Sequence, residues 1–329
     1  MTVLITGGAG YIGSHTVLAF LDAGETPVVV DDLSTGFDWL VPEGVPFYRC
    51  DIADKDAIET ILRDHGIETV LHFAGSIILS ESVENPLRYY RNNTVNSLGL
   101  LEAAVACGVK HFVFSSTAAV YGLPDSLPVA ETAPLRPEAP YGSSKLMTEQ
   151  MLLDAANAHD LKVTALRYFN VSGADPRGRS GQSTRNASNL IKVACEAATG
   201  KRTALTIHGQ DYDTPDGTAI RDYIHVSDLA SAHRLAVERL RGGGGNLIAN
   251  CGYGRGFSVL EVVRSVKAAS GSDFTVEMGT RRPGDCPEVI ADNALARAEL
   301  HWQPELDDLD RIVGDAFRWE QTLSRRNRT

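Results

Sequence analysis

The sequence predicts an α/β protein with a doubly wound, Rossmann-type parallel sheet and a smaller α/β C-terminal domain. Three observations favour this fold class. Short apolar runs alternate with helical patterns over the first half of the chain, a glycine-rich turn follows the first run, and the pattern becomes loop-rich after about Gly173. Strands that are apolar along their whole length are typical of parallel sheets covered on both faces. We therefore expect a helix layer on each side of the sheet.

The elements of the first half follow from these runs in order. β-branched and aromatic residues predict strands at 2–6, 27–30, 69–73, 111–114 and 162–167. Helical spacing predicts helices at 12–23, 57–64, 96–106 and 142–158. Gly108 is the expected stop of the third helix, because glycine readily adopts the left-handed conformation that ends helices. Residues 1–172 are therefore the predicted nucleotide-binding domain.

The second half has shorter elements and more turns. The polar segment 175–188 predicts a loop, 213–217 and 282–285 predict turns, and 242–245 predicts a flexible connector. We expect the segments at about 218–250 to return to the first domain, and 173–329 to form the substrate-binding region. The basic tail 324–329 is expected to be solvated and frayed.

Composition excludes several classes of protein. The chain has 329 residues, of which 43% are hydrophobic, and a formal net charge of −11. This negative charge argues against nucleic-acid partners and anionic membrane surfaces. The five cysteines stand far apart without a CxxC pair, and His208, His225 and His233 lack ligand spacing, so we expect no metal. Reduced thiols, no export signal and no apolar run of about 20 residues indicate a cytoplasmic location.

A phosphate-binding turn is predicted directly after the first strand. Gly7, Gly10 and Gly13 have G-x-x-G-x-x-G spacing, with Tyr11 and Ile12 inside the motif. Glycines at these positions permit a tight turn and bring backbone N–H groups close to a pyrophosphate at the helix N-terminus. A tight turn without a ligand would give the same pattern, so the motif depends on its context.

An acidic residue at the end of the second strand supplies that context. Asp31 lies 18 residues after Gly13, and Asp32 follows it. A carboxylate at this position accepts hydrogen bonds from an adenosine ribose and repels a 2′-phosphate, which favours NAD over NADP. The alternative is that both aspartates are only turn residues.

Tyr141 and Lys145 are four residues apart and therefore share one face of a helix. Lowering the pKa of a tyrosine from about 10 to about 7 requires about 4 kcal/mol. One cation at about 4 Å supplies about that much at an effective dielectric constant near 20. Lys145 and a nicotinamide ring are the expected cations, and Tyr141 the acid/base. The alternative is an ordinary amphipathic pair.

Hydroxyl groups follow the predicted strand 111–114. Ser115, Ser116 and Thr117 would lie at the carboxyl edge of the sheet, where doubly wound folds bind ligands. Thr117 is the expected hydrogen-bond partner of a substrate hydroxyl while Tyr141 moves its proton. The alternative is a β-turn with solvated hydroxyls.

These motifs resemble the extended short-chain dehydrogenase/reductases, and within them the UDP-glucose 4-epimerase family, also called UDP-galactose 4-epimerases. The matching stretches are GGAGYIGSHT (7–16), HFAG (72–75), ESVENPLRYYRNN (81–93), FSSTAAVYG (114–122), YGSSKLMTEQ (141–150), RYFNVSGA (167–174) and DGTAIRDYIHVSDLA (216–230). They span nearly the whole chain, and the last two are more specific to the epimerases than the glycine pattern is.

The resemblance implies tightly held NAD, a UDP-hexose substrate and a homodimer packed through helices near 90–107 and 142–158. Beyond the residues above, it places cofactor contacts at Asp51, Ile52, Phe73, Ala74, Gly75, Asn92, Ser115 and Tyr168. It places contacts with the nucleotide sugar at Asn170, Asn189, Leu190, Arg221, Tyr223, Arg282, Asp285 and Val289. The arginines would neutralise the diphosphate, since guanidinium groups bind phosphate oxygens bidentately, and Asp285 would bind the uridine ribose.

Two positions depart from the common family pattern. Ile77 stands where many relatives have a lysine, which removes one polar contact to the nicotinamide end of the cofactor. Val289 stands where glucose-restricted relatives have a tyrosine, and a small residue there leaves room for an N-acetyl group at C2. We expect UDP-GlcNAc and UDP-GalNAc to be accepted as well.

The implied activity is that of an isomerase: NAD-dependent C4 epimerisation of a UDP-hexose through a transient 4-keto intermediate. A nucleotide-sugar 4,6-dehydratase or UDP-glucuronate decarboxylase is the first alternative. Those enzymes place an acid just after the Ser/Thr of the edge loop, where this chain has Ala118 and Ala119. A non-catalytic NAD-binding regulator is a lesser alternative, since it would be free to lose Tyr141, Lys145 or Thr117.

Overall fold

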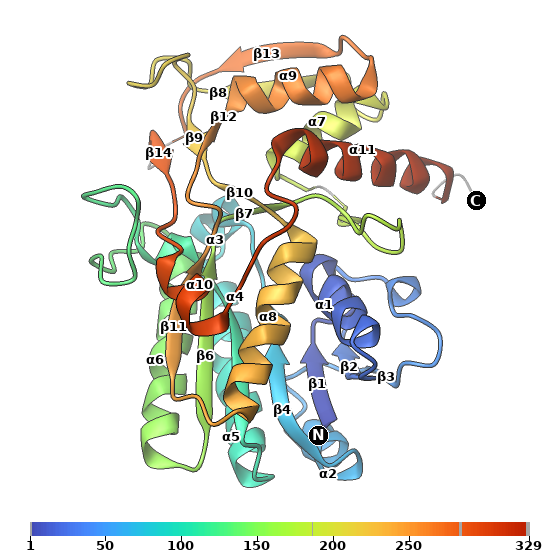
Figure 1. Ribbon diagram of the computed structural model, residues 1–329, viewed down its shortest axis with the longest axis vertical. Helices are drawn as coiled ribbons and strands as arrows, with labels where there is room; N and C mark the ends of the chain where they lie inside the picture. Colours follow the sequence, from blue (N-terminus) through green and yellow to red (C-terminus); the bar gives the residue numbers. More distant parts are fainter. Residues whose placement is uncertain (1, 186, 283–284, 327–329) are drawn as a thin grey trace.

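A seven-stranded parallel sheet forms the centre of the protein in a computed structural model that describes residues 2–185, 187–282 and 285–326 (Figure 1). The strand order is β11-β6-β5-β4-β1-β2-β3. Their bounds are β1 Thr2–Thr6, β2 Val28–Asp31, β3 Phe47–Arg49, β4 Ile67–His72, β5 His111–Thr117, β6 Lys162–Tyr168 and β11 Leu247–Cys251. This is the predicted fold class, and it places the carboxyl ends of these strands at one edge of the sheet.

Successive residues of each strand face different cores, which explains why the strands are apolar throughout. Leu4, Val28 and Val30 pack into one core, whereas Ile5 and Val29 pack into the other. Helices α2 (Lys55–Asp64), α5 (Asn96–Ala106) and α6 (Pro140–Ala158) cover the first core. Helices α1 (Tyr11–Asp22) and α8 (Val226–Arg241) cover the second and contact each other.

The remaining elements lie at the carboxyl edge of the sheet, at the upper end of Figure 1. Helices α7 (Leu190–Ala198), α9 (Val259–Ser270) and α11 (Leu309–Arg326) pack against one another there, and α10 spans Ala294–Leu300. Three small sheets accompany them: β7 (Asn170–Ser172) with β10 (Tyr223–His225), β8 (Ala204–His208) with β13 (Thr275–Gly279), and β9 (Ile220–Arg221) between β12 (Phe257–Ser258) and β14 (Glu288–Val289).

Short helical segments complete the fold between these elements. Two short α-helices, α3 (Leu79–Glu84) and α4 (Pro86–Tyr89), lead into a π-helical turn, η2 (Tyr90–Val95). Two 3-10 turns, η1 (Asp38–Leu40) and η3 (Ala118–Val120), follow β2 and β5. Since π-helical turns are frequent at functional sites, the side chains of η2 are candidates for the functional site.

Several sequence predictions differ from the structure at their ends. Helix α5 has the predicted bounds, but β4 begins at Ile67 and ends at His72, one residue before the predicted end. The tail predicted to fray is helical as far as Arg326, because the apolar face of α11 docks through Ile312, Val313 and Phe317. Residues 327–329 lie outside the described residues. Strand β11, which belongs to the second half of the chain, pairs with β6 in the central sheet.

Candidate active site at the carboxyl edge of the sheet

The glycine turn packs tightly enough that side chains are excluded from it. Gly7 has a φ of +71°, and a Cβ built there would lie 2.7 Å from the backbone nitrogen of Ala74. A Cβ at Gly13 would lie 2.1 Å from the carbonyl oxygen of Gly7. Gly10 is the N-cap of α1, so Tyr11 and Ile12 lie in its first turn with their N–H groups directed toward the helix end. This cradle fits a pyrophosphate.

Asp31 lies beside this turn, whereas Asp32 does not. The Asp31 carboxylate is buried and accepts hydrogen bonds from the backbone nitrogens of Ala9 at 3.0 Å and Leu33 at 2.8 Å. Burial raises its pKa, and these two bonds oppose that rise. The exposed Asp32 accepts from the backbone nitrogen and hydroxyl of Ser34, so it caps its own loop. Asp31 is thus the carboxylate available to an adenosine ribose.

Of the two residues after β3 that were predicted to contact the adenine, one lies at the surface and the other in the core. The Asp51 carboxylate is exposed and accepts from the backbone nitrogen of Ala53 at 2.9 Å. The Ile52 side chain is buried in the core that α2, α5 and α6 cover. Sequence reasoning overlooked the loop after Asp31, which folds back onto the glycine turn through a 3.0 Å bond from Phe37 N to Ala9 O.

The segment after β4 lies between the glycine turn and α6. The ring of Phe73 packs against the ring of His233, with 4.7 Å between centroids. Ala74 contacts Gly7, and a Cβ built at Gly75 would lie 3.6 Å from Lys145 Nζ. The structure therefore brings the predicted cofactor segment to the predicted catalytic lysine. The Ile77 side chain is 61% exposed on the same loop.

Asn93 holds this segment in place and was missed by the sequence analysis. Its side chain is buried in η2, accepts from Ser76 N at 2.7 Å, and donates to Ser76 O at 2.9 Å and Ser144 Oγ at 3.0 Å. The predicted residue, Asn92, donates to Ser76 Oγ at 2.9 Å. The paired asparagines of the RYYRNN motif were the available signal, but the sequence did not show which one is buried.

Tyr141 and Thr117 meet where β5 ends and α6 begins. Helix α6 starts at Pro140, and a Cβ built at Gly142 would lie only 2.6 Å from Ala119 O. This close approach brings the Thr117 side chain near the phenol of Tyr141. Burial raises the pKa of Tyr141, and the Thr117 hydroxyl lowers it. The sequence analysis expected Lys145 to be the protein group that lowers it.

Lys145 is directed at the neighbouring strand. Its Nζ donates to Ser115 O at 2.9 Å and lies 4.8 Å from the ring centroid of Phe114. Burial lowers the pKa of Lys145 to about 8, and the negative charge of Glu149 opposes that change. The lysine is therefore close to its own titration at neutral pH.

Tyr168 lies at the end of β6, next to these groups. Its hydroxyl hydrogen-bonds the Ser115 hydroxyl, and the registers of β5 and β6 place Thr117 opposite Tyr168. Burial raises the pKa of Tyr168, and the charge of Tyr141 adds to the rise. The hydroxyl groups of Ser115 and Tyr168 are thus both protonated at neutral pH.

Predicted substrate residues gather on the small sheets. Tyr223 pairs in register with Asn170, and Arg221 pairs with Val289. Tyr223 is buried, which raises its pKa. The guanidinium of Arg221 forms an ion pair with Asp285. The structure thus joins two residues to which the sequence analysis gave separate roles, the diphosphate and the ribose.

Other predicted substrate residues lie around this pair. Asn189 is the N-cap of α7 and donates to Val171 O at 2.9 Å, and Leu190 is the first residue of that helix. The side chain of Arg282 is exposed and adjoins residues 283–284, which the structure does not describe. Because Arg282 precedes Asp285 by three residues, it lies on the same loop as the ion pair.

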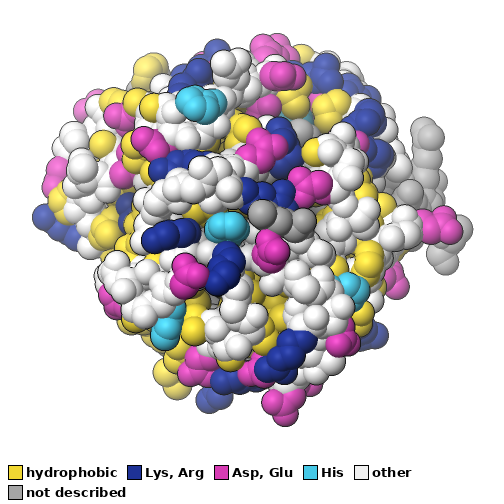
Figure 2. Space-filling model, turned by 60° about the horizontal axis from the view of Figure 1, so that its bottom comes forward, with side chains coloured by type: hydrophobic (Ala, Val, Ile, Leu, Met, Phe, Trp, Pro, Cys, Tyr) yellow, Lys and Arg dark blue, Asp and Glu magenta, His cyan; other side chains and the backbone are white. Residues whose placement is uncertain are grey.

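Three properties of the rest of the described molecule concern metal binding, membrane crossing and surface charge. Among the described residues there is no group of three His, Cys, Asp or Glu side chains arranged for a metal, and no helix that could cross a membrane. Figure 2 shows lysine and arginine side chains interspersed with aspartate and glutamate on the displayed face. The negative net charge is therefore not concentrated on this face.

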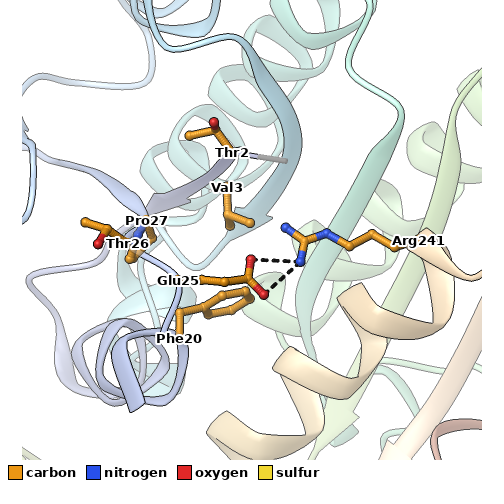
Figure 3. Close-up of a pocket in the computed structure, with 7 residues that line it drawn as sticks. All are labelled: Thr2, Val3, Phe20, Glu25, Thr26, Pro27 and Arg241. Atoms are coloured by element: carbon orange, nitrogen blue, oxygen red, sulfur yellow. Dashed lines mark hydrogen bonds and ion pairs between the residues drawn. The ribbon is translucent and has the colours of Figure 1, made fainter. Parts of the chain in front are cut away.

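A separate hollow of about 300 Å³ lies at the opposite end of β1 (Figure 3). Thr2 and Val3 line it, together with Phe20, Glu25, Thr26, Pro27 and Arg241. Glu25 accepts two hydrogen bonds from Arg241, at 2.9 and 2.8 Å. Since Gly7 follows the other end of β1, this hollow is not part of the candidate site.

The family is shown by comparison with known proteins. Residues 3–252 match the family model described as "NAD dependent epimerase/dehydratase family". The chain belongs to that family. A curated UDP-glucose 4-epimerase from Azospirillum brasilense is 56% identical over 321 residues, which are 98% of this chain and 92% of the relative. The resemblance inferred from the motifs is thereby confirmed.

Solved structures give the same result. A UDP-glucose 4-epimerase from Brucella ovis in complex with NAD is 45% identical, with a TM-score of 0.94 over 97% of this chain and 98% of that one. The UDP-Glc/GlcNAc 4-epimerase from Campylobacter jejuni is 46% identical, with a TM-score of 0.86 over 98% of this chain and 99% of that one. The likeness therefore covers both halves of the fold.

Proposed function

We propose that the protein epimerises C4 of a UDP-hexose, interconverting UDP-glucose and UDP-galactose with NAD as its resident cofactor. The observation that carries this proposal is the meeting of Thr117, Tyr141 and Lys145 at the carboxyl edge, between the glycine turn and the small sheets. The named activity of relatives at up to 56% identity supports it.

The residues of the first half fit the cofactor. The turn at Gly7–Gly13 would hold the pyrophosphate, Asp31 the adenosine ribose, and the segment 73–75 with Tyr168 the nicotinamide end. Bound NAD would supply the acceptor for the C4 hydride and the donor that returns it. Because no redox equivalent is consumed, the cofactor stays bound between turnovers.

Tyr141 is the proposed acid and base. Its Oη takes the proton of the C4 hydroxyl as that carbon is oxidised to the ketone, and returns it when the ketone is reduced on the opposite face. Thr117 holds the phenol and the reacting hydroxyl together. Burial opposes ionisation of Tyr141, so nearby positive charge, including that of Lys145, must stabilise the phenolate.

The second half holds the nucleotide firmly and the hexose loosely. Arg221 and Arg282 would bind the diphosphate, and Asp285 the uridine ribose. Since Arg221 is paired with Asp285, the diphosphate competes with a carboxylate for that guanidinium. Asn170, Asn189, Leu190 and Tyr223 would contact the rest of the nucleotide sugar. The hexose must turn over within the pocket to expose its other face.

Val289 leads us to propose that N-acetylated sugars are also substrates. It lies on β14 in register with Arg221, and the family resemblance implies that a tyrosine at this position would take up the space of a C2 substituent. The Campylobacter jejuni relative is named for both UDP-Glc and UDP-GlcNAc. UDP-GlcNAc and UDP-GalNAc are therefore included in the proposed substrate class.

A dehydratase or decarboxylase would need an acid near the reacting carbon. The turn η3, which follows Thr117, offers Ala118 and Ala119 at that place. Purified protein with UDP-galactose and no added NAD tests the proposal by NMR and mass spectrometry. We expect UDP-glucose of unchanged mass. Loss of water or carbon dioxide, or bound NAD without turnover on any UDP-sugar, would contradict it.

We also propose a homodimer and a cytoplasmic location. Three apolar side chains are exposed on the segments expected to pair, Val95 at 55%, Leu98 at 41% and Met147 at 47%, and Leu87 of the preceding helix α4 is 80% exposed. Exposed apolar patches of this kind commonly mark protein interfaces. All five cysteines are free thiols, as expected in a reducing compartment.

A further inference from the structure

A buried ion pair lies one helical turn beyond Lys145. Glu149 of α6 accepts two hydrogen bonds from Arg167 of β6, at 2.9 Å from Nε and 2.6 Å from Nη2. Their side chains are only 2% and 3% exposed. Replacing a buried ion pair of this kind by apolar residues is often neutral or stabilising. Stability alone is therefore a weak reason for its presence beside a reaction site.

Helix geometry connects this pair to the chemistry. Tyr141, Lys145 and Glu149 are spaced four residues apart and lie along one face of α6. Burial, partly opposed by the negative charge of Glu149, lowers the pKa of Lys145 to about 8. Without that carboxylate, the buried lysine would lose its proton more readily at neutral pH.

The other groups around Lys145 do not supply a negative charge that could replace that of Glu149. Burial and the charge of Lys145 together lower the pKa of His72, on β4, to about 3, so His72 is neutral. Burial raises the pKa of Tyr168, on β6, so its hydroxyl stays protonated. Ser115 offers only its carbonyl oxygen. In the described part of the chain, Glu149 is the anion that acts on Lys145.

Three neutral partners hold the ion pair in this orientation. Ser116 donates its hydroxyl to Glu149, and Arg167 Nη1 donates to the Tyr121 hydroxyl at 3.0 Å. The Tyr121 hydroxyl in turn donates to Asn250 Oδ1 at 2.7 Å. The carboxylate therefore has little freedom to turn away from the lysine.

We propose that Glu149, fixed by Arg167, is a positioning residue that keeps Lys145 protonated and so sets the pH at which Tyr141 becomes the working base. The proposal rests on the proposed function, because it concerns the same tyrosine and lysine. It adds a requirement that lies outside the Tyr-Lys motif itself.

The test is the pH profile of kcat and kcat/KM for UDP-galactose in holoenzyme carrying Glu149→Gln. We expect the rising limb to move up by about one pH unit, which is about a tenfold loss at pH 7 with recovery in alkali. In a Lys145→Met background the same substitution should add no further shift, because the charge it tunes is gone. A wild-type profile for Glu149→Gln, or a full shift without Lys145, would overturn the proposal.

Two further variants separate this role from folding. Tyr121→Phe removes a neutral partner of Arg167, so we expect a lower melting temperature and an unshifted profile. If Glu149→Gln does not fold, the double variant Glu149→Gln/Arg167→Met avoids a buried unpaired guanidinium and should show a smaller shift in the same direction, because the cation of the pair is removed with the anion. An unshifted profile in a folded double variant would contradict the proposal.

A readout without turnover keeps the two proposals distinguishable. The ultraviolet absorbance of the Tyr141 phenolate is obtained by pH titration of the protein minus Tyr141→Phe. Glu149→Gln should move this titration to higher pH in the same way. An inactive wild type would refute the proposed function, whereas an unmoved phenolate titration in Glu149→Gln would refute the role of Glu149.

Discussion

Tyr141 shows that a motif alone does not determine the chemistry of a residue. Its phenol is almost fully buried at the start of α6, and burial works against the ionised form it needs. The contact with Thr117 opposes this effect, and positive charge must supply the rest. The reactivity of Tyr141 therefore depends on a group from another element, Thr117 at the end of β5, as well as on α6 itself.

Tyr141→Phe removes the proton-carrying oxygen and keeps the ring. We expect kcat to fall by about 10²- to 10⁴-fold, the usual contribution of an acid/base group. UDP affinity, measured by calorimetry, should stay close to wild type because the nucleotide is held by the second half. Near-normal turnover in this variant would refute the acid/base role.

The proposed role of Val289 in sugar choice belongs to the same scale. Val289→Tyr should reduce kcat/KM for UDP-GlcNAc relative to UDP-glucose by about 10- to 200-fold, the range of a size filter. Val289→Ala is the matched control and should retain both activities. A wild-type preference for UDP-glucose beyond about 100-fold would retire the proposal of N-acetyl acceptance.

Helix α6 serves two purposes at the scale of elements. One face carries Tyr141, Lys145 and Glu149 into the buried site, and Met147 on another face is exposed. Helix α5 exposes Leu98 in the same way. Helix α6, which carries the proposed catalytic residues Tyr141 and Lys145, and its neighbour α5 therefore both expose apolar side chains.

Leu98→Arg tests the dimer proposed for these helices. A charge in an apolar interface is costly, so we expect the mass measured by light scattering to fall from two chains to one. Leu123→Arg is the control, since Leu123 is 47% exposed on a loop outside these helices. A monomeric wild type at micromolar concentration would contradict the proposal.

Buried histidines shape the behaviour of the whole molecule. Burial lowers the pKa of His15, His225 and His233 to about 4, and that of His72 to about 3. The unfolded chain binds protons on these groups near pH 6.5, whereas the folded protein does not. Their contribution to stability is complete above that pH and is lost as the pH falls toward 4.

We therefore expect the free energy of unfolding, measured with urea, to fall between pH 6.5 and about 4. Each histidine contributes about 1.4 kcal/mol per pH unit. Asp222 acts the other way between about pH 4 and 6, because burial raises its pKa to about 6. His233→Leu should reduce the slope, and exposed His159→Gln should not. A flat profile would contradict this account.

Local patterns determined much of this protein from its sequence. The apolar runs predicted the parallel sheet, and helix α5 has the predicted bounds. The glycine spacing and the Tyr141–Lys145 interval predicted where the groups of the candidate site would gather. These features could be predicted because strand and helix periods repeat over a few residues.

Tertiary structure alone decided which distant groups meet. No local pattern indicated that Arg221 pairs with Asp285, 64 residues later, or that Asn93 rather than Asn92 is buried against Ser76. It also did not show that Arg167 forms an ion pair with Glu149 behind Lys145. Such partners depend on how strands and helices pack, and the strength of each charge depends on how far packing removes it from water.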